Sequence, residues 1–95
     1  MTAAVIRYRT KPEAADENQR LIEKVFAELA EQQPAGLSYQ AFRLSDGVSF
    51  VHVVDDADGS LRQLAAFEEF QRDLTDRLAV QPEREEGTRI GGWPR

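Results

Sequence analysis

Val48-Ser49-Phe50-Val51-His52-Val53-Val54 alternates as a β-strand does, and this stretch decides the fold. Successive strand side chains point to opposite faces, so one face carries Val48, Phe50, His52 and Val54 and the other carries Ser49, Val51 and Val53. Both faces are largely apolar, so the side chains of both faces must be buried away from water by other parts of the protein. Two amphipathic helices on the same side of a sheet cover only one face. The pattern therefore predicts a second subunit against the other.

The preceding segment, 37–44, forms a β-hairpin with this strand. Asp46-Gly47 favours a two-residue turn with positive backbone angles. In that register Tyr39 opposes Val54, Ala41 opposes His52 and Arg43 opposes Phe50. One face then carries Leu37, Tyr39, Ala41, Arg43, Phe50 and His52, and the sequence leaves open which cover this face receives.

Further strands and helices are predicted on both sides of the hairpin. Residues 3–9 alternate as a first strand, and 84–93 form a weakly patterned last strand. A capping box, Thr10 with Glu13, begins a helix that runs to about Gln32, and a second box, Ser60 with Gln63, begins a helix over 61–78. The first helix has an inner stripe at helical spacing, and the second has another. These stripes are Ala14, Asn18, Leu21, Ile22, Val25 and Leu29 in the first helix and Leu64, Phe67, Phe70, Leu74 and Leu78 in the second.

The resulting order is βαββαβ, typical of a ferredoxin-like α+β fold with a four-stranded antiparallel sheet and both helices on one face. The far face of that sheet stays apolar. Pairing it with the same face of a second copy closes the two sheets into a dimeric α/β barrel.

Composition narrows the classes of partner and site. The 95 residues suit one domain, 1–95, and the net charge of −5 with scattered basic residues argues against nucleic-acid and anionic-membrane partners. No apolar run approaches the roughly 20 residues of a membrane span, and the charged N-terminus does not fit a signal peptide. The absence of cysteine excludes disulfides and thiolate metal sites and is compatible with the cytoplasm, where we expect the protein.

The element order, the entry Thr10-Lys11-Pro12-Glu13, and the run Phe50-Val51-His52-Val53-Val54-Asp55 leading through an acidic loop to Leu61, Phe67 and Phe70 resemble one family. This is the antibiotic-biosynthesis-monooxygenase-like family of the dimeric α/β-barrel superfamily, and the resemblance covers essentially all 95 residues. It implies a single domain of that type and a homodimer. Family members include cofactor-independent oxygenases of phenolic or quinol compounds, haem-degrading enzymes and small proteins without known activity.

The chain departs from the haem-degrading members. Those enzymes use an Asn on the first strand with a Trp and a His on or near the second helix, positions that fall near Val5, Leu61 and Gln71 here. Glutamine cannot ligate haem iron as imidazole does, so haem degradation is disfavoured. Related quinol oxygenases often carry a histidine in the second helix too, and none lies between Leu61 and Leu78.

His52, the only histidine, has two interpretations. Beside Tyr39 and Arg43, its imidazole could deprotonate a phenol and so generate the electron-rich anion that reacts with oxygen. Alternatively, it is a core histidine hydrogen-bonded to its surroundings, or one that lines the dimer barrel.

The other candidates also have two interpretations each. Tyr8, Tyr39 and Trp93 either line an aromatic pocket or are large side chains at sheet edges. Arg7 and Arg43 either hold a substrate carboxylate or phenolate or form ion pairs across the dimer. Asp55, Asp56 and Asp58 lack the spacing of a calcium loop and fit a solvated turn and helix cap.

Two functional hypotheses result. In the first, the protein is a cofactor-independent oxygenase of a small aromatic, phenolic or quinol compound, with no cofactor and no metal. Its pocket lies between sheet and helices, with His52 as catalytic base, Tyr39, Arg43 and Arg7 binding the substrate, and Phe50 and Trp93 as walls. In the second, the same fold is a non-catalytic dimeric binding or accessory module, in which the same residues pack or hold a small ligand. This alternative stands because a shared fold does not imply a shared activity.

Overall fold

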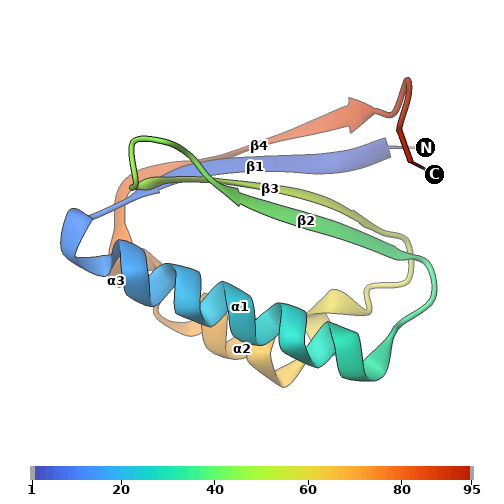
Figure 1. Cartoon of the computed structure of the whole chain (residues 1–95), viewed down its shortest axis with the longest axis horizontal. Coiled ribbons are helices and arrows are strands. Elements are labelled where there is room, and N and C mark those ends of the chain that lie inside the picture. Colours follow the sequence, from blue (N-terminus) through green and yellow to red (C-terminus); the bar gives the residue numbers. More distant parts are fainter. Residues whose placement is uncertain (1, 95) are drawn as a thin grey trace.

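The computed structural model describes residues 2–94, which form one sheet with helices packed against one of its faces (Figure 1). The strands are β1 (Thr2–Thr10), β2 (Leu37–Arg43), β3 (Ser49–Asp56) and β4 (Leu78–Thr88). The helices are η1 (Pro12–Ala14), α1 (Ala15–Gln32), η2 (Leu61–Gln63), α2 (Ala65–Arg72) and α3 (Leu74–Arg77), of which η1 and η2 are single 3₁₀ turns.

The sheet order is β2-β3-β1-β4 and every neighbouring pair is antiparallel. The two halves of the chain thus contribute one inner strand and one edge strand each, with α1 and α2 side by side beneath (Figure 1). This confirms the predicted ferredoxin-like α+β fold with a four-stranded antiparallel sheet. No helix among residues 2–94 is long and apolar enough to cross a membrane.

The hairpin has the predicted register but not the predicted turn. Tyr39 pairs with Val54, Ala41 with His52 and Arg43 with Phe50. Within the connection between β2 and β3, only Gly47 has a positive φ, of 78°, and its N–H donates to the Leu44 carbonyl at 2.9 Å. The connection is therefore a longer loop in which a single glycine, rather than a two-residue pair, adopts the left-handed conformation.

Neither predicted capping box forms. Thr10 is the last residue of β1, and its hydroxyl donates to the Val48 carbonyl at 3.3 Å instead of capping a helix. At the second helix Ser60 makes no side-chain cap; the Asp56 carboxylate accepts the N–H groups of Ser60 and Leu61 at 2.9 and 3.0 Å. A carboxylate from the end of β3 thus caps this turn, which agrees with the cap predicted for the acidic loop.

The predicted helix over 61–78 is divided into η2, α2 and α3, and the last strand begins at Leu78 rather than at residue 84. Leu64 has extended backbone angles and Asp73 is non-helical, which separates the three pieces. Pro82 lies inside β4 and does not end an element. It is tolerated because β4 is an edge strand whose register against β1 shifts at this point, between the pairs of Arg7 and Arg9.

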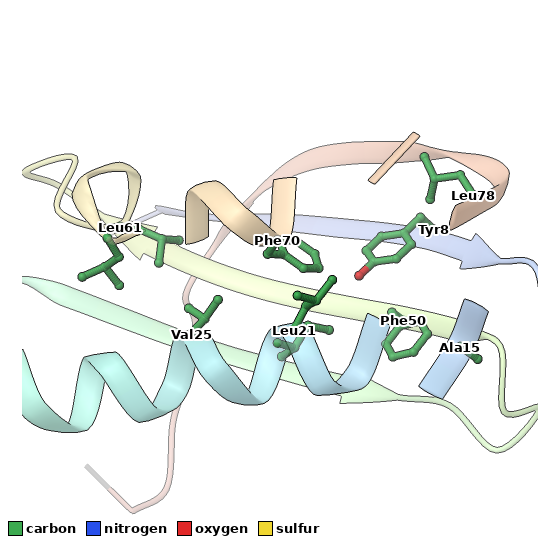
Figure 2. Close-up of a cluster of buried hydrophobic side chains, with 10 residues drawn as sticks. Tyr8, Ala15, Leu21, Val25, Phe50, Leu61, Phe70 and Leu78 are labelled. Carbon is green, nitrogen blue, oxygen red and sulfur yellow. The ribbon is translucent and has the colours of Figure 1, made fainter. Parts of the chain in front are cut away.

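The core fills the space between the sheet and the helices (Figure 2). Asn18, Leu21, Ile22 and Val25 of the predicted α1 stripe are buried, and Val25 is fully enclosed. They face Tyr8 and Phe50 from the sheet and Leu61, Leu64 and Phe70 from the second half of the chain. Full burial of an aromatic side chain such as Phe50 contributes roughly 1.5–3 kcal/mol to folding.

Candidate functional site

A cavity of about 780 Å³ lies between the sheet and the helices of the second half of the chain. Its apolar lining includes Ile6, Leu61, Phe67, Phe70 and Leu74, and its hydrogen-bonding lining includes Tyr8, Tyr39 and His52. Five charged side chains also line it: Asp55, Asp56, Arg62, Arg84 and Glu86. The lining therefore combines an apolar part with polar and charged groups in nearly equal share. A hollow in which apolar side chains meet convergent polar groups is typical of a small-molecule site.

His52 lies in this cavity wall between two tyrosines. Its Nε2 is 2.9 Å from the Tyr8 hydroxyl, and its Nδ1 is 2.6 Å from the Tyr39 hydroxyl. Both tyrosine rings also stack on the imidazole, with ring centres 5.3 and 5.7 Å away. The three side chains form a hydrogen-bonded row along the sheet.

The strand register explains this row. His52 pairs with Ala41 on β2 and with Ile6 on β1. Tyr39 and Tyr8 each lie two residues from those partners, so they share the face of His52 as its diagonal neighbours. That face is the one that the helices cover, which answers the question that the sequence left open.

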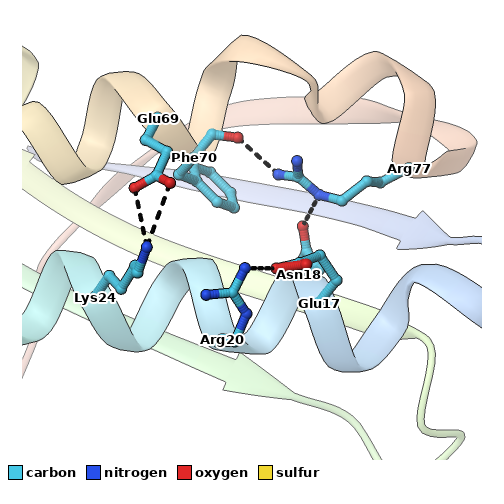
Figure 3. A network of polar contacts seen from close by, with 7 residues as sticks. All are labelled: Glu17, Asn18, Arg20, Lys24, Glu69, Phe70 and Arg77. Atoms are coloured by element: carbon cyan, nitrogen blue, oxygen red, sulfur yellow. Dashed lines mark hydrogen bonds and ion pairs between the residues drawn. The ribbon is translucent and has the colours of Figure 1, made fainter.

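Two buried polar residues extend the row into the core, and Figure 3 shows the contacts that one of them, Arg77, makes with Asn18 and Phe70. Asn18 of α1 is fully buried and donates from Nδ2 to the Tyr8 hydroxyl at 2.9 Å. Arg77 is 7% exposed; it donates from Nε to the Asn18 Oδ1 at 3.0 Å and from Nη2 to the Phe70 carbonyl at 2.6 Å. Among the described residues, no buried side-chain nitrogen or oxygen lacks a hydrogen-bond partner.

The sequence analysis assigned no site role to either residue. Asn18 carried a signal, because a polar residue inside an apolar helical stripe needs a buried partner. Arg77 carried a signal too, because it lies seven residues after Phe70 and three after Leu74, at the spacing of the predicted buried stripe. It was passed over because arginine is rarely buried unless it is paired.

Burial keeps the row uncharged at neutral pH. Desolvation lowers the pKa of His52 to about 4. It raises the pKa of Tyr8 to about 12, against the opposing effects of the Asn18 hydrogen bond and the Arg77 charge. The pKa of Tyr39 is raised as well, mainly by burial. A neutral imidazole has one donor and one acceptor nitrogen, so His52 donates to one tyrosine and accepts from the other.

The structure brings only two of the six predicted site residues, His52 and Tyr39, to the cavity. Arg43 instead contacts the Asp16 carboxylate at 3.1 Å, Gln19 at 2.7 Å and the Gly47 carbonyl at 2.9 Å. Phe50 is 1% exposed and stacks on Tyr8 within the core, outside the cavity lining.

The other two, Arg7 and Trp93, also lie outside the cavity lining. Arg7 is exposed and alternates with Tyr8, so it lies on the opposite face of the sheet. Trp93 follows β4 and is 92% exposed in the single chain. Among residues 2–94, no group of three or more histidine or acidic side chains is placed to hold a metal ion.

Comparison with known proteins extends these observations. No protein-family model matches the chain, and no curated protein matches it either. Solved structures do match. One is an antibiotic biosynthesis monooxygenase, with 18% identity, a TM-score of 0.72 and coverage of 96% of this chain and 100% of that chain.

Two further structures are similar over nearly their whole length. Rv0793 from Mycobacterium tuberculosis has 13% identity, a TM-score of 0.72 and coverage of 97% of both chains. A mutant of SnoaB, a cofactor-independent oxygenase from Streptomyces nogalater, has 19% identity, a TM-score of 0.65 and coverage of 99% of this chain and 97% of that chain. The chain therefore has the fold of the antibiotic biosynthesis monooxygenase structures, in agreement with the resemblance seen in the sequence.

Proposed function

We propose that the protein is a cofactor-independent monooxygenase of a small phenolic, quinol or other oxygen-bearing aromatic compound. The observation that carries the proposal is the Tyr39–His52–Tyr8 row in the wall of a cavity of about 780 Å³ with an aromatic and aliphatic lining. The similarity to SnoaB, a cofactor-independent oxygenase, supports the reaction class.

The proposed reaction draws its electrons from the substrate. A phenol loses its hydroxyl proton to solvent water, and the phenolate ring carbon bonds to one oxygen atom of O₂. The O–O bond then breaks to leave a quinone, and the outer oxygen atom leaves as water with two protons, one from the phenol hydroxyl and one from the attacked ring carbon. For the simplest phenol this balances as C₆H₆O + O₂ → C₆H₄O₂ + H₂O, with all four electrons supplied by the ring. Formation of the phenolate is therefore the step that the protein must favour.

In this proposal Tyr39 contacts the phenolate oxygen, and His52 acts through Tyr39. A pKa of about 4 makes His52 a poor base for a phenol, whose pKa is about 10. The six-unit gap corresponds to about 8 kcal/mol. A neutral tyrosine hydroxyl held by a buried imidazole is instead suited to stabilise an oxygen anion in a site of low polarity.

Oxygen consumption with a series of phenols and hydroquinones tests this function. Tyr39→Phe is expected to lower turnover by about 10²-fold, the usual loss on removal of one anion-stabilising donor. His52→Ala, which leaves Tyr39 without its partner, is expected to lower turnover as well. Glu31→Ala, on the exposed surface of α1, serves as the control. Turnover that is the same in Tyr39→Phe and the native protein would contradict the proposal.

A second function is favoured by one observation: both nitrogens of His52 already have tyrosine partners, so the row is complete without a substrate. In this alternative the protein is a non-catalytic module that binds a small aromatic ligand. Phenols that bind to the purified protein while oxygen consumption stays at the level of buffer would favour it.

We also propose that the protein is a homodimer formed through the uncovered face of the sheet. Val5, Phe42 and Val80 lie 37, 49 and 45% exposed, and Val51 and Val53 are half-buried. Val5, Phe42, Val51 and Val53 share the face opposite His52. Contact with the same face of a second copy removes these side chains from water without any change in the protomer.

A further inference from the structure

Five buried or half-buried side chains connect the core to the cavity through consecutive hydrogen bonds. In order they are Arg77, Asn18, Tyr8, His52 and Tyr39. One end of the series is chemically fixed, because a guanidinium has only donors. The direction of each following bond can therefore be worked out from Arg77 toward the cavity.

Arg77 determines the orientation of the Asn18 amide. Since its Nε donates at 3.0 Å, the facing atom must be the acceptor Oδ1. The Asn18 Nδ2 then faces the Tyr8 hydroxyl at 2.9 Å and donates to its oxygen. The reversed amide would place donors against the guanidinium in a residue that is fully buried.

Tyr8 passes this direction to the histidine. Its oxygen accepts from Asn18, and the only other partner of its hydroxyl among the described residues is the Nε2 of His52 at 2.9 Å. If Nε2 carried a proton, the Tyr8 hydrogen would have no acceptor among the described residues and would have to turn toward the cavity, although the side chain is only 4% exposed. Nε2 is therefore the acceptor, and the proton of the neutral imidazole lies on Nδ1.

The final bond determines what the cavity presents to a ligand. The Nδ1–H of His52 donates to the Tyr39 oxygen at 2.6 Å, so the Tyr39 hydrogen is not used in this bond. No other hydrogen bond of Tyr39 is found among the described residues, and its side chain lines the cavity. The free hydrogen is thus available to a ligand there.

We propose that Arg77 and Asn18 are positioning residues that fix His52 in its Nδ1-protonated form, which makes Tyr39 a hydrogen-bond donor to the cavity. The cavity then selects flat aromatic compounds with an acceptor oxygen, as in an aromatic ketone, a quinone or a phenolate, over compounds of the same shape that offer an N–H. This inference rests on the proposed ligand-binding role of the cavity, but it needs no oxidation step.

Nitrogen-15 NMR tests the tautomer directly, because the chain has one histidine and its ring signals need no further assignment. The native protein at neutral pH is expected to show a protonated Nδ1 and an unprotonated Nε2. Asn18→Asp is expected to reverse this pattern. Its carboxylate, held ionised by Arg77, accepts from both Arg77 and Tyr8, so the Tyr8 hydrogen turns away and Nε2 must donate.

Gln19→Glu is the matched control. It adds the same negative charge at the next position of α1, where the side chain contacts Arg43 instead of Tyr8. The tautomer is expected to stay unchanged in this variant, which separates the direction of the hydrogen bonds from a general effect of charge.

Ligand selectivity tests the consequence in the cavity. Fluorenone and carbazole are flat tricyclic molecules of similar size; the first offers a carbonyl acceptor and the second an N–H donor. The native protein is expected to bind fluorenone about tenfold more tightly than carbazole, as one hydrogen bond provides. Asn18→Asp is expected to reverse the preference, because Tyr39 then donates to Nδ1 and presents its oxygen to the ligand.

An Nε2-protonated histidine in the native protein overturns the inference, and this measurement needs no variant to fold. The inference is also overturned if the folded Asn18→Asp variant keeps the native tautomer, or if the native protein binds both probes equally. Absence of oxygen consumption with phenols, together with the expected tautomers and selectivity, would remove the proposed oxygenase activity and leave this inference in place.

Discussion

His52 is a buried titratable group whose neutral form the protein stabilises. It is 4% exposed and contacts a tyrosine hydroxyl at each ring nitrogen. A neutral imidazole needs one donor and one acceptor as partners, and a hydroxyl can serve as either. The pair of tyrosines therefore satisfies the neutral ring, whereas protonation would place a cation in the core where no carboxylate of residues 2–94 hydrogen-bonds the ring.

Stability is expected to fall as the pH falls from about 6.5 to about 4. In this window the unfolded chain takes up a proton at histidine, with an ordinary pKa of 6.5, while the folded protein takes it up only near its lowered pKa of about 4. The unfolded state binds more protons, so acid favours unfolding. The difference amounts to about 3 kcal/mol of unfolding free energy, measurable by urea denaturation at a series of pH values.

His52→Gln should remove this dependence, because glutamine does not titrate. Asp46 does not interfere with this test. Hydrogen bonds from the Ser49 hydroxyl and from the Val48 and Ser49 amides lower the pKa of its carboxyl from 3.8 to about 2. Its effect on the unfolding free energy is therefore lost mainly below pH 4, outside the pH range in which His52 acts. An equal loss of stability in the native protein and His52→Gln between these pH values would refute the role of the histidine.

At the scale of elements, the turn from β3 to η2 depends on a single carboxylate. Asp56 is the last residue of β3 and accepts two backbone N–H groups of the next helical turn, from Ser60 and Leu61. The Leu61 side chain is buried in the core and also lines the cavity. This cap therefore positions one wall of the candidate site.

Asp56→Ala is expected to destabilise the protein by about 1 kcal/mol, the usual cost of losing a helix N-cap. Asp58→Ala is the matched control, since it removes the same charge from an exposed position of the same loop. Thermal unfolding followed by circular dichroism measures both variants. Equal midpoints for the two variants would show that the charge of the loop matters and the cap does not.

At the scale of the whole molecule, the two faces of the sheet have different cover. The helices bury the face that carries Tyr8, Phe50 and His52. In the single chain, no helix covers the opposite face, which carries Val5, Phe42 and Val53. In the proposed homodimer a second copy covers this face and adds burial, which a small domain needs because much of its surface stays exposed.

The native protein is expected to sediment at twice its chain mass of 10.7 kDa at micromolar concentration. Val53→Glu places a charge in the proposed interface and should shift sedimentation to the single chain, with an unchanged circular dichroism spectrum. Ala30→Glu, an exposed position of α1, makes the same change on the helix side and should leave the dimer intact. A native protein that sediments as one chain would exclude this interface.

The sequence by itself determined those features that depend on local periodicity. Alternation placed Phe50 and His52 on one face, the pairing of 37–44 with 48–54 put Tyr39 beside them, and helical spacing identified the buried stripe of α1. These predictions hold because side-chain direction repeats every two residues in a strand and every 3.6 in a helix, whatever the rest of the chain does.

Only the tertiary structure decided which residues meet. Arg77 and Asn18 are 59 positions apart and touch because α1 packs against α2 and α3, a tertiary contact that no local pattern encodes. For the same reason Arg43 pairs with the side chains of α1 and does not face the cavity. Period fixes the direction of a side chain, whereas its partner depends on how separate elements come together in three dimensions.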